Sequence, residues 1–229
     1  MEAELKFVRI GFTNVFFIIQ DGKCLIVDTG TRGEEKKLLR AISNIGCSLK
    51  DVKYIFLTHT HYDHAGSAAG LKALSGAQVI VHESEAEYLK NGFTPIPKGT
   101  SAVFKLISKA GKLKNSIEKK VAGYPPLKPD ILFKDVLSLD QYGFNAEVRH
   151  IPGHTLGSSG LILGDKAIVG DCMFNLKGRL YPGFADDENQ LVKTWKQVLK
   201  WNVNWFYPGH GKRFNKVELL KAAAKKGIK

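Results

Sequence analysis

The sequence lacks the features that secreted and membrane proteins carry. Its three cysteines, Cys24, Cys47 and Cys172, are odd in number and have no Cys-x-x-Cys spacing, which argues against a disulfide framework. No run of apolar residues approaches the roughly 18–20 that a membrane span needs. The first residues, Met1-Glu2-Ala3-Glu4, are partly acidic, unlike a signal peptide. We therefore expect a reduced, cytoplasmic protein that does not cross a membrane.

Acidic residues are also scarce relative to basic ones. The chain has 22 Asp and Glu against 34 Lys and Arg, which gives a formal net charge of +12. The surplus lies in residues 98–128 and 200–229, each with eight basic side chains and one acid. Such segments attract nucleic acid, anionic lipid or a small anionic substrate. They are also typical of lysine-rich helix faces that only contact solvent, and both interpretations stay open.

The chain does have enough apolar sequence for a core. Its 229 residues, of which 44% are hydrophobic, fit an ordinary globular protein. We predict one domain over residues 1–229, with a basic helical insert at about residues 91–130. Apolar residues of the insert, beginning with Val103 and Leu106, recur at helical spacing. We expect this apolar face to pack on the body beside the active site as a lid or wall; a membrane-surface or partner helix is the alternative.

The two halves of the chain repeat one order of elements. In the first half, a hairpin around Asp21-Gly22 is followed by Asp28, a helix, a strand over 52–57 and His59. In the second half, a hairpin is followed by Asp171, a helix, a strand over 203–207 and His210. This repeat predicts two similar β-rich units around a pseudo-two-fold axis, with functional residues at matching strand ends.

The densest polar stretch is Thr58-His59-Thr60-His61-Tyr62-Asp63-His64-Ala65-Gly66. It follows the apolar strand over 52–57 and precedes a run of small residues that predicts a helix. Neutral imidazole and ionised carboxylate are the usual nitrogen and oxygen ligands of zinc, manganese and iron. A polar turn with chance histidines is the bland alternative, and the clustering of so many ligand types argues against it.

Three further candidates stand where strands stop and glycine-rich loops begin. They are His154 in Pro152-Gly153-His154-Thr155, Asp171 after Gly170, and His210 between Gly209 and Gly211. Glycine lets such loops turn sharply and bring distant side chains together. Five of the seven histidines thus belong to a predicted metal site, and we expect the other two, His82 and His150, to be structural.

These motifs together resemble the metallo-β-lactamase superfamily, over nearly the whole chain. The resemblance rests on the His-x-His-x-Asp-His stretch and four shorter motifs: Val27-Asp28-Thr29-Gly30, Pro152-Gly153-His154-Thr155, Gly170-Asp171 and Gly209-His210-Gly211. It implies an α/β fold of the α+β kind, a four-layer αββα sandwich with a pseudo-two-fold repeat. It also implies a centre of two divalent metal ions, Zn²⁺ in the first place and Mn²⁺ or Fe²⁺ as alternatives.

The resemblance implies a role for each candidate. The first metal position would be held by His59, His61 and His154, the second by Asp63, His64 and His210, and Asp171 would bridge the two. Asp28 would orient ligands through hydrogen bonds, with a carboxylate that only stabilises its turn as the alternative. A metal-bridging hydroxide would attack the substrate, and Asp63 would be the catalytic residue that passes the proton to the leaving group.

The resemblance narrows the function without naming a substrate. Glyoxalase II enzymes share the seven ligands, so we expect a hydrolase of a small ester-like substrate, most of all a thioester, with lactones or other esters as further options. Their basic C-terminal domain is not evident here, and Phe174 replaces the tyrosine typical of lactonases. The substrate is expected to be a small molecule, which the basic segments would suit if it is anionic. The alternative is a phosphodiesterase or ribonuclease that binds nucleic acid through those segments. The oligomeric state stays open, with a dimer as one option.

Overall fold

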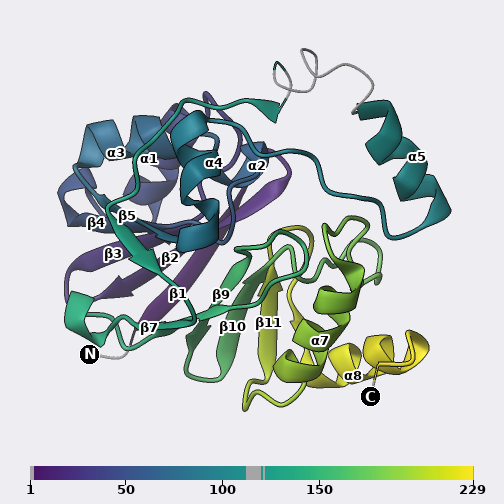
Figure 1. Cartoon of the computed structure of the whole chain (residues 1–229). Helices are drawn as coiled ribbons and strands as arrows, with labels where there is room; N and C mark the ends of the chain where they lie inside the picture. The colour runs from purple at the N-terminus through teal and green to yellow at the C-terminus, as the bar shows by residue number, and fades with distance from the viewer. Residues whose placement is uncertain (1–2, 112–119, 121, 229) are drawn as a thin grey trace.

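The computed structural model describes residues 3–111, 120 and 122–228, and its frame is two six-stranded β-sheets packed face to face (Figure 1). The first sheet has its strands in chain order. They are β1 (Glu4–Ile10), β2 (Thr13–Gln20), β3 (Lys23–Val27), β4 (Val52–Phe56), β5 (Gln78–His82) and β6 (Ile131–Phe133). Its helices are α1 (Glu35–Asn44), α2 (Tyr62–Ala65), α3 (Ala68–Ser75) and α4 (Ala86–Asn91).

The second sheet comes from the other half of the chain, and its strands also follow chain order. They are β7 (Val136–Ser138), β8 (Glu147–His150), β9 (Ser159–Leu163), β10 (Lys166–Gly170), β11 (Trp205–Pro208) and β12 (Phe214–Asn215). The helices α7 (Glu188–Val198) and α8 (Lys216–Lys225) cover its outer face (Figure 1). The short 3-10 turns are Leu49–Asp51, Glu83–Glu85 and Asp140–Tyr142.

Strand pairing confirms the internal repeat. The hairpin β2–β3 is antiparallel and β3 then pairs in parallel with β4, after the crossover through α1. In the second half, the hairpin β9–β10 is antiparallel and β10 pairs in parallel with β11, after the crossover through α7. A parallel pair needs such a crossover, so each helix is placed on the outer face of its own sheet.

The core has three layers of apolar contact, which confirm the four-layer sandwich. Between the sheets, Phe16 of β2 and Ile168 of β10 belong to one buried cluster. Outside the first sheet, Leu38 of α1 packs against the strands, and outside the second sheet Trp195 of α7 packs with Leu219 of α8. Each of these large side chains contributes about 1.5–3 kcal/mol of burial free energy.

The segment predicted as a basic insert contains α5 (Ala102–Gly111), which extends from the body (Figure 1). The expected packing of its apolar face is wrong for the two positions that can be compared, because Val103 is 66% exposed and Leu106 is 70% exposed. The helix instead contacts the body through Phe104, whose ring meets Phe184 edge to face with centroids 5.0 Å apart. The part of the predicted helix over 112–119 and at 121 lies outside the described residues.

No helix in the described part of the chain combines the length and apolar character that a bilayer crossing requires.

Candidate metal centre

The loops that follow strand ends carry all seven predicted ligands to one edge of the sandwich. The stretch after β4 supplies His59 and His61, and the short helix α2 supplies Asp63 and His64. The loops after β8, β10 and β11 supply the other three, which are His154, Asp171 and His210. The structure therefore brings together every residue that the sequence predicts for the centre.

The seven side chains form overlapping groups whose candidate ligand atoms lie within 4.8 Å of one another. One group is His59, His61 and His154, and another is Asp63, His64 and His210. A third, His59, His64 and Asp171, connects them. These are the same two trios that the resemblance implies.

Asp171 is the central carboxylate of the cluster. Its Oδ2 lies 3.3 Å from Nε2 of His210 and 3.5 Å from Nε2 of His154. Its Oδ1 lies 3.4 Å from Nε2 of His64. One carboxylate thus faces imidazoles from both trios, which is the position that a bridging ligand requires.

The outer ring nitrogen of each imidazole is held by a neighbouring oxygen. The N–H groups of His154 and His210 are directed at the carbonyl oxygens of Phe184 and Phe12, over 3.0 and 2.9 Å. That of His61 is directed at the carbonyl of Pro95 over 3.3 Å. Such contacts fix the tautomer and leave the inner nitrogen free to bind a metal.

Asp28 holds predicted ligands in place through hydrogen bonds. Its Oδ2 lies 2.8 Å from Nδ1 of His64, and the carboxylate also accepts the backbone N–H and hydroxyl of Thr58. Thr58 precedes His59, and its hydroxyl lies 3.1 Å from Nδ1 of that ring. Asp28 is fully buried and has a positive φ of 62°. It joins two predicted ligands through one network, which is the role that the resemblance implies.

The buried polar atoms of the cluster fit a metal ion. Nε2 of His59 is buried and has no hydrogen-bond partner among the described residues. An orphaned imidazole nitrogen in a core costs free energy unless something binds it. Burial and the neighbouring imidazoles keep the pKa of His59 well below its usual value, and burial with His154 lowers the pKa of His61 to about 3. His59 and His61 are therefore neutral, which is the form that coordinates metals.

The second trio is held by opposite charges. Burial opposes the charge on His210, but Asp171 and Asp63 outweigh it and raise the pKa of His210 to about 10. Burial likewise opposes the charge on Asp63, and the imidazoles of His64 and His210 lower its pKa to about 2. A metal ion that binds here would displace the imidazole protons, and the resulting nitrogen and ionised oxygen donors suit zinc, manganese or iron.

Comparison with known proteins decides the family. The sequence model of the metallo-beta-lactamase superfamily matches residues 8–210. The chain belongs to this superfamily. It is 26% identical over 211 residues to a protein of Methanocaldococcus jannaschii named as a probable metallo-hydrolase, covering 90% of this chain and 92% of that protein. It is 31% identical over 183 residues to the hydroxyacylglutathione hydrolase GloC of Haemophilus influenzae, covering 76% and 73% of the two chains.

Solved structures of the superfamily share the fold. A metallo-beta-lactamase family protein of Thermus thermophilus aligns with a TM-score of 0.70 at 22% identity, over 98% of this chain and 79% of that one. A metallo-beta-lactamase of Cronobacter sakazakii aligns with a TM-score of 0.71 at 18% identity, over 97% and 88%. The chain is thus a metallo-hydrolase of this superfamily, and its cluster of His and Asp fits a divalent metal site.

The sequence interpretation missed Glu85, a fully buried carboxylate behind the centre. It accepts the backbone N–H and hydroxyl of Thr60, which stands between His59 and His61. Its other oxygen accepts the backbone N–H of Gly157, in the loop that carries His154. One side chain thus fixes two loops that supply the first trio.

We expect Glu85→Ala to lower metal affinity about ten- to a hundredfold, the usual effect of removing a group that positions ligands. The two loops would lose their common acceptor while every predicted ligand remains. Zinc titration with a competing chelator measures the effect, and Glu85→Gln should recover part of it through its one carbonyl oxygen.

Glu87→Ala is the matched control for Glu85→Ala. Glu87 belongs to α4, its side chain is 75% exposed, and it pairs with Lys90. We expect zinc affinity to stay unchanged in this variant. Equal affinity in the Glu85 and Glu87 variants would show that Glu85 does not position the centre.

The remaining sequence expectations concern three rings near the centre. His82 and His150 stack with centroids 4.0 Å apart, and each also contacts a backbone carbonyl oxygen, so both serve the scaffold. Phe174 lies edge to face with His210, with centroids 5.1 Å apart, and near His154. Its ring faces imidazoles of both trios and has no hydroxyl to offer a substrate.

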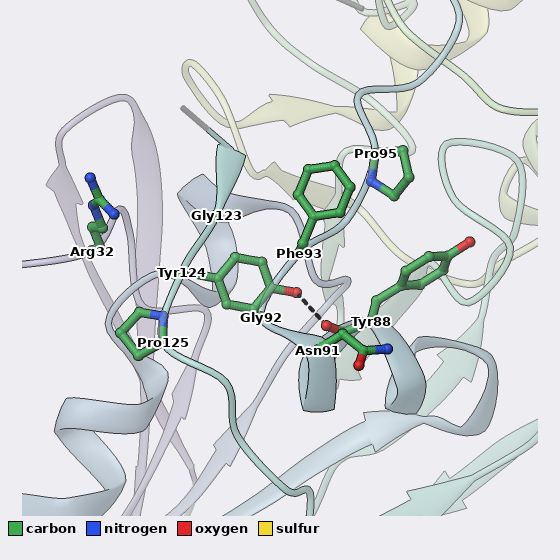
Figure 2. Close-up of a pocket in the computed structure, with 9 residues that line it drawn as sticks. All are labelled: Arg32, Tyr88, Asn91, Gly92, Phe93, Pro95, Gly123, Tyr124 and Pro125. Atoms are coloured by element: carbon green, nitrogen blue, oxygen red, sulfur yellow. Dashed lines mark hydrogen bonds between the residues drawn. The ribbon is translucent and has the colours of Figure 1, made fainter. Parts of the chain in front are cut away.

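A cavity of about 380 Å³ opens onto the centre, and residues of both trios line it. A larger cavity of about 840 Å³, lined by Arg32, Tyr88 and Tyr124, contains none of the predicted ligands (Figure 2). Pro95 lines that larger cavity, and its carbonyl oxygen contacts His61. The smaller cavity is therefore the one in which chemistry at the centre can act.

Proposed function

We propose that the protein hydrolyses a small ester-like substrate, a thioester first of all, at a centre of two divalent metal ions. The observation that carries the proposal is the pair of trios joined by Asp171, of which the first is buried, with an orphaned His59 nitrogen directed into the cluster. The similarity to the hydroxyacylglutathione hydrolase of Haemophilus influenzae supports the thioester.

Each residue has a distinct task in this proposal. The trio His59, His61 and His154 would hold one ion, the trio Asp63, His64 and His210 would hold the other, and Asp171 would be shared between them. Zinc is the ion that we propose, since imidazole and carboxylate are its common ligands. When bound, the ions supply Lewis acidity, which activates water and polarises the substrate carbonyl.

Asp63 is the proposed proton carrier. Its Oδ2 lies 3.3 Å from Nε2 of His210 and 3.4 Å from the hydroxyl of Thr13, and its side chain is 15% exposed. It also lines the cavity that opens onto the centre. A carboxylate that is partly open to the cavity can accept a proton from the attacking water and donate it to the leaving group.

We expect Asp63→Ala to lower kcat by about a hundredfold, in line with the usual contribution of general acid–base catalysis. The fold should persist, because Asp63 is only partly buried. Steady-state kinetics with metal analysis of the same sample separate the loss of a proton carrier from the loss of an ion. Full activity in this variant would exclude both roles for Asp63.

The experiment that tests the proposed function is a panel of substrates on protein of known metal content. The panel contains a thioester, a lactone and a phosphodiester, and each is assayed before and after removal of the metal. We expect the thioester to be hydrolysed fastest, and chelation to abolish its hydrolysis. Metal-stripped protein that keeps full activity would refute the mechanism, and preference for the phosphodiester would favour the nuclease alternative.

A further inference from the structure

The cavity over the centre has an apolar wall. Eleven residues line it, and five of them belong to the predicted centre. The other six are aromatic or apolar. They are Tyr62, Ile96, Pro97, Phe174, Leu176 and Phe184. At about 380 Å³, the cavity lies at the small end of the 300–1,000 Å³ that is usual for small-molecule sites.

Among the residues that the structure describes, no lysine or arginine lines this cavity. Three lysines of the insert, Lys98, Lys105 and Lys109, line a different cavity together with Asp186 and Glu188. An anionic acyl group beside Phe184 would therefore lose its hydration without gaining a cationic partner from the wall, which is unfavourable. An apolar acyl group would be favoured there, because its burial removes apolar surface from water.

The wall is fixed in place by the start of the insert. The residues before α5 pair with the loop that holds Phe184: the N–H of Ala185 donates to the carbonyl of Lys98, and the N–H of Thr100 donates to that of Gly183, over 2.8 and 2.9 Å. The ring of Phe104 also packs edge to face against the ring of Phe184. A wall that is already ordered binds an apolar group without a further cost in side-chain entropy.

From this wall we infer that the substrate carries an apolar acyl chain, and that Leu176 and Phe184 determine the preference. The inference rests on the proposed thioester hydrolysis and specifies its substrate class. The cavity is small, so the acyl part occupies it and the larger thiol part remains outside. Leu176 is 49% exposed, at the open rim of the cavity, where a longer chain would reach it.

The test is a series of thioesters that share one neutral thiol, N-acetylcysteamine, and differ in the acyl group. With the zinc-loaded protein, we expect kcat/KM to rise about fourfold for each methylene from acetyl to hexanoyl, the factor that corresponds to burial of one methylene. The polar lactoyl thioester should be slower than the propionyl thioester. Rates that are flat or fall with chain length, or a preference for lactoyl, would overturn the inference.

Substitution of two leucines of similar exposure distinguishes an effect of the cavity wall from a general effect of removing a surface leucine. Leu176 is 49% exposed and Leu220, on α8, is 51% exposed. In Leu176→Ala, the ratio of the hexanoyl rate to the acetyl rate should fall several-fold. In Leu220→Ala, which is remote from the cavity, the ratio should not change. An unchanged ratio in both variants would remove Leu176 from the specificity wall.

Binding of the carboxylate products gives a readout that does not depend on turnover. Calorimetry of acetate, butanoate, hexanoate and lactate with the zinc-loaded protein should give affinities that rise with chain length, with lactate weakest for its size. If no thioester is hydrolysed but hexanoate still binds most tightly, the proposed function fails and the apolar site stands. If thioesters are hydrolysed but hexanoate has no advantage, the inference fails alone.

Discussion

Asp171→Asn is expected to remove at least one metal ion per chain and to lower kcat/KM about a thousandfold or more. Asparagine keeps the shape of the side chain but loses the negative charge that faces His64, His154 and His210 at 3.3–3.5 Å. Bound ions contribute several kcal/mol to stabilisation of the transition state, and each 1.36 kcal/mol corresponds to a factor of ten in rate. Elemental analysis and steady-state kinetics measure the two effects.

Asp165→Asn is the matched control for this substitution. Asp165 stands in the turn between β9 and β10, its side chain is 49% exposed, and it pairs with Lys166. We expect metal content and kcat/KM to equal those of the unsubstituted protein. An Asp171→Asn variant with two ions and full activity would exclude the carboxylate from the centre.

Gly209→Ala should have an effect of similar size, although it changes no predicted ligand. A Cβ atom at this position would overlap Oδ1 of Asp171 and would lie 2.7 Å from Cε1 of His64. Both side chains are buried, so they cannot move away without disturbing the core. Displacement of two ligands together should lower kcat/KM about a thousandfold, since a misplacement of about 1 Å can alone cost about a hundredfold.

Gly70→Ala provides the comparison for Gly209→Ala. The nearest atoms to a Cβ atom at Gly70 would belong to the side chain of Glu35, which is flexible and can rotate away. In the helix α3, alanine is also favoured over glycine by up to about 1 kcal/mol. We expect Gly70→Ala to keep metal content and activity and to unfold no more easily. Normal metal content in Gly209→Ala would contradict the steric argument.

The ligand cluster was predictable because its chemistry is local in the sequence. Four of the seven residues fall within positions 59–64, and the other three follow strand ends next to glycines. Strands that end at one edge of a sandwich bring such residues together whatever the details of packing. The repeat of hairpin, helix and strand was predictable for the same reason, since turn signals and periodicity are read from adjacent residues.

Glu85 and Asn14 were not predictable, because their roles depend on partners far away in the chain. Glu85 stands among Glu83 and Glu87 in a stretch that is typical of an exposed helix start, yet the fold buries it fully against the loop of Gly157. Asn14 is an ordinary polar residue of a strand until its side chain is placed against residues 208–211. Burial of this kind arises only when the two halves pack together.

For the insert, the sequence predicts a packed apolar face that the structure does not show at Val103 and Leu106. Its apolar periodicity predicts a helix, and α5 is present, but periodicity does not say which face finds a partner. Phe104 contacts the body and Ser108 contacts Pro97 at the start of the insert, while Val103 and Leu106 face solvent. The partner is the loop around Phe184, about eighty residues away in the chain, and nothing in the local sequence indicates that contact.

Asn14 links the second strand of the chain to the loop that carries the last predicted ligand. Its backbone N–H donates to Gly209 over 2.8 Å, and its side-chain amide donates to the carbonyls of Pro208 and Gly211. During synthesis, the ribosome releases the four predicted ligands of residues 59–64 long before Asp171 and His210. The nascent chain therefore offers only a partial chelate, which holds an ion weakly. If the seven residues hold metal as proposed, we expect tight loading only after the C-terminal half has docked on Asn14, so a filled centre would mark a chain that is folded in both halves.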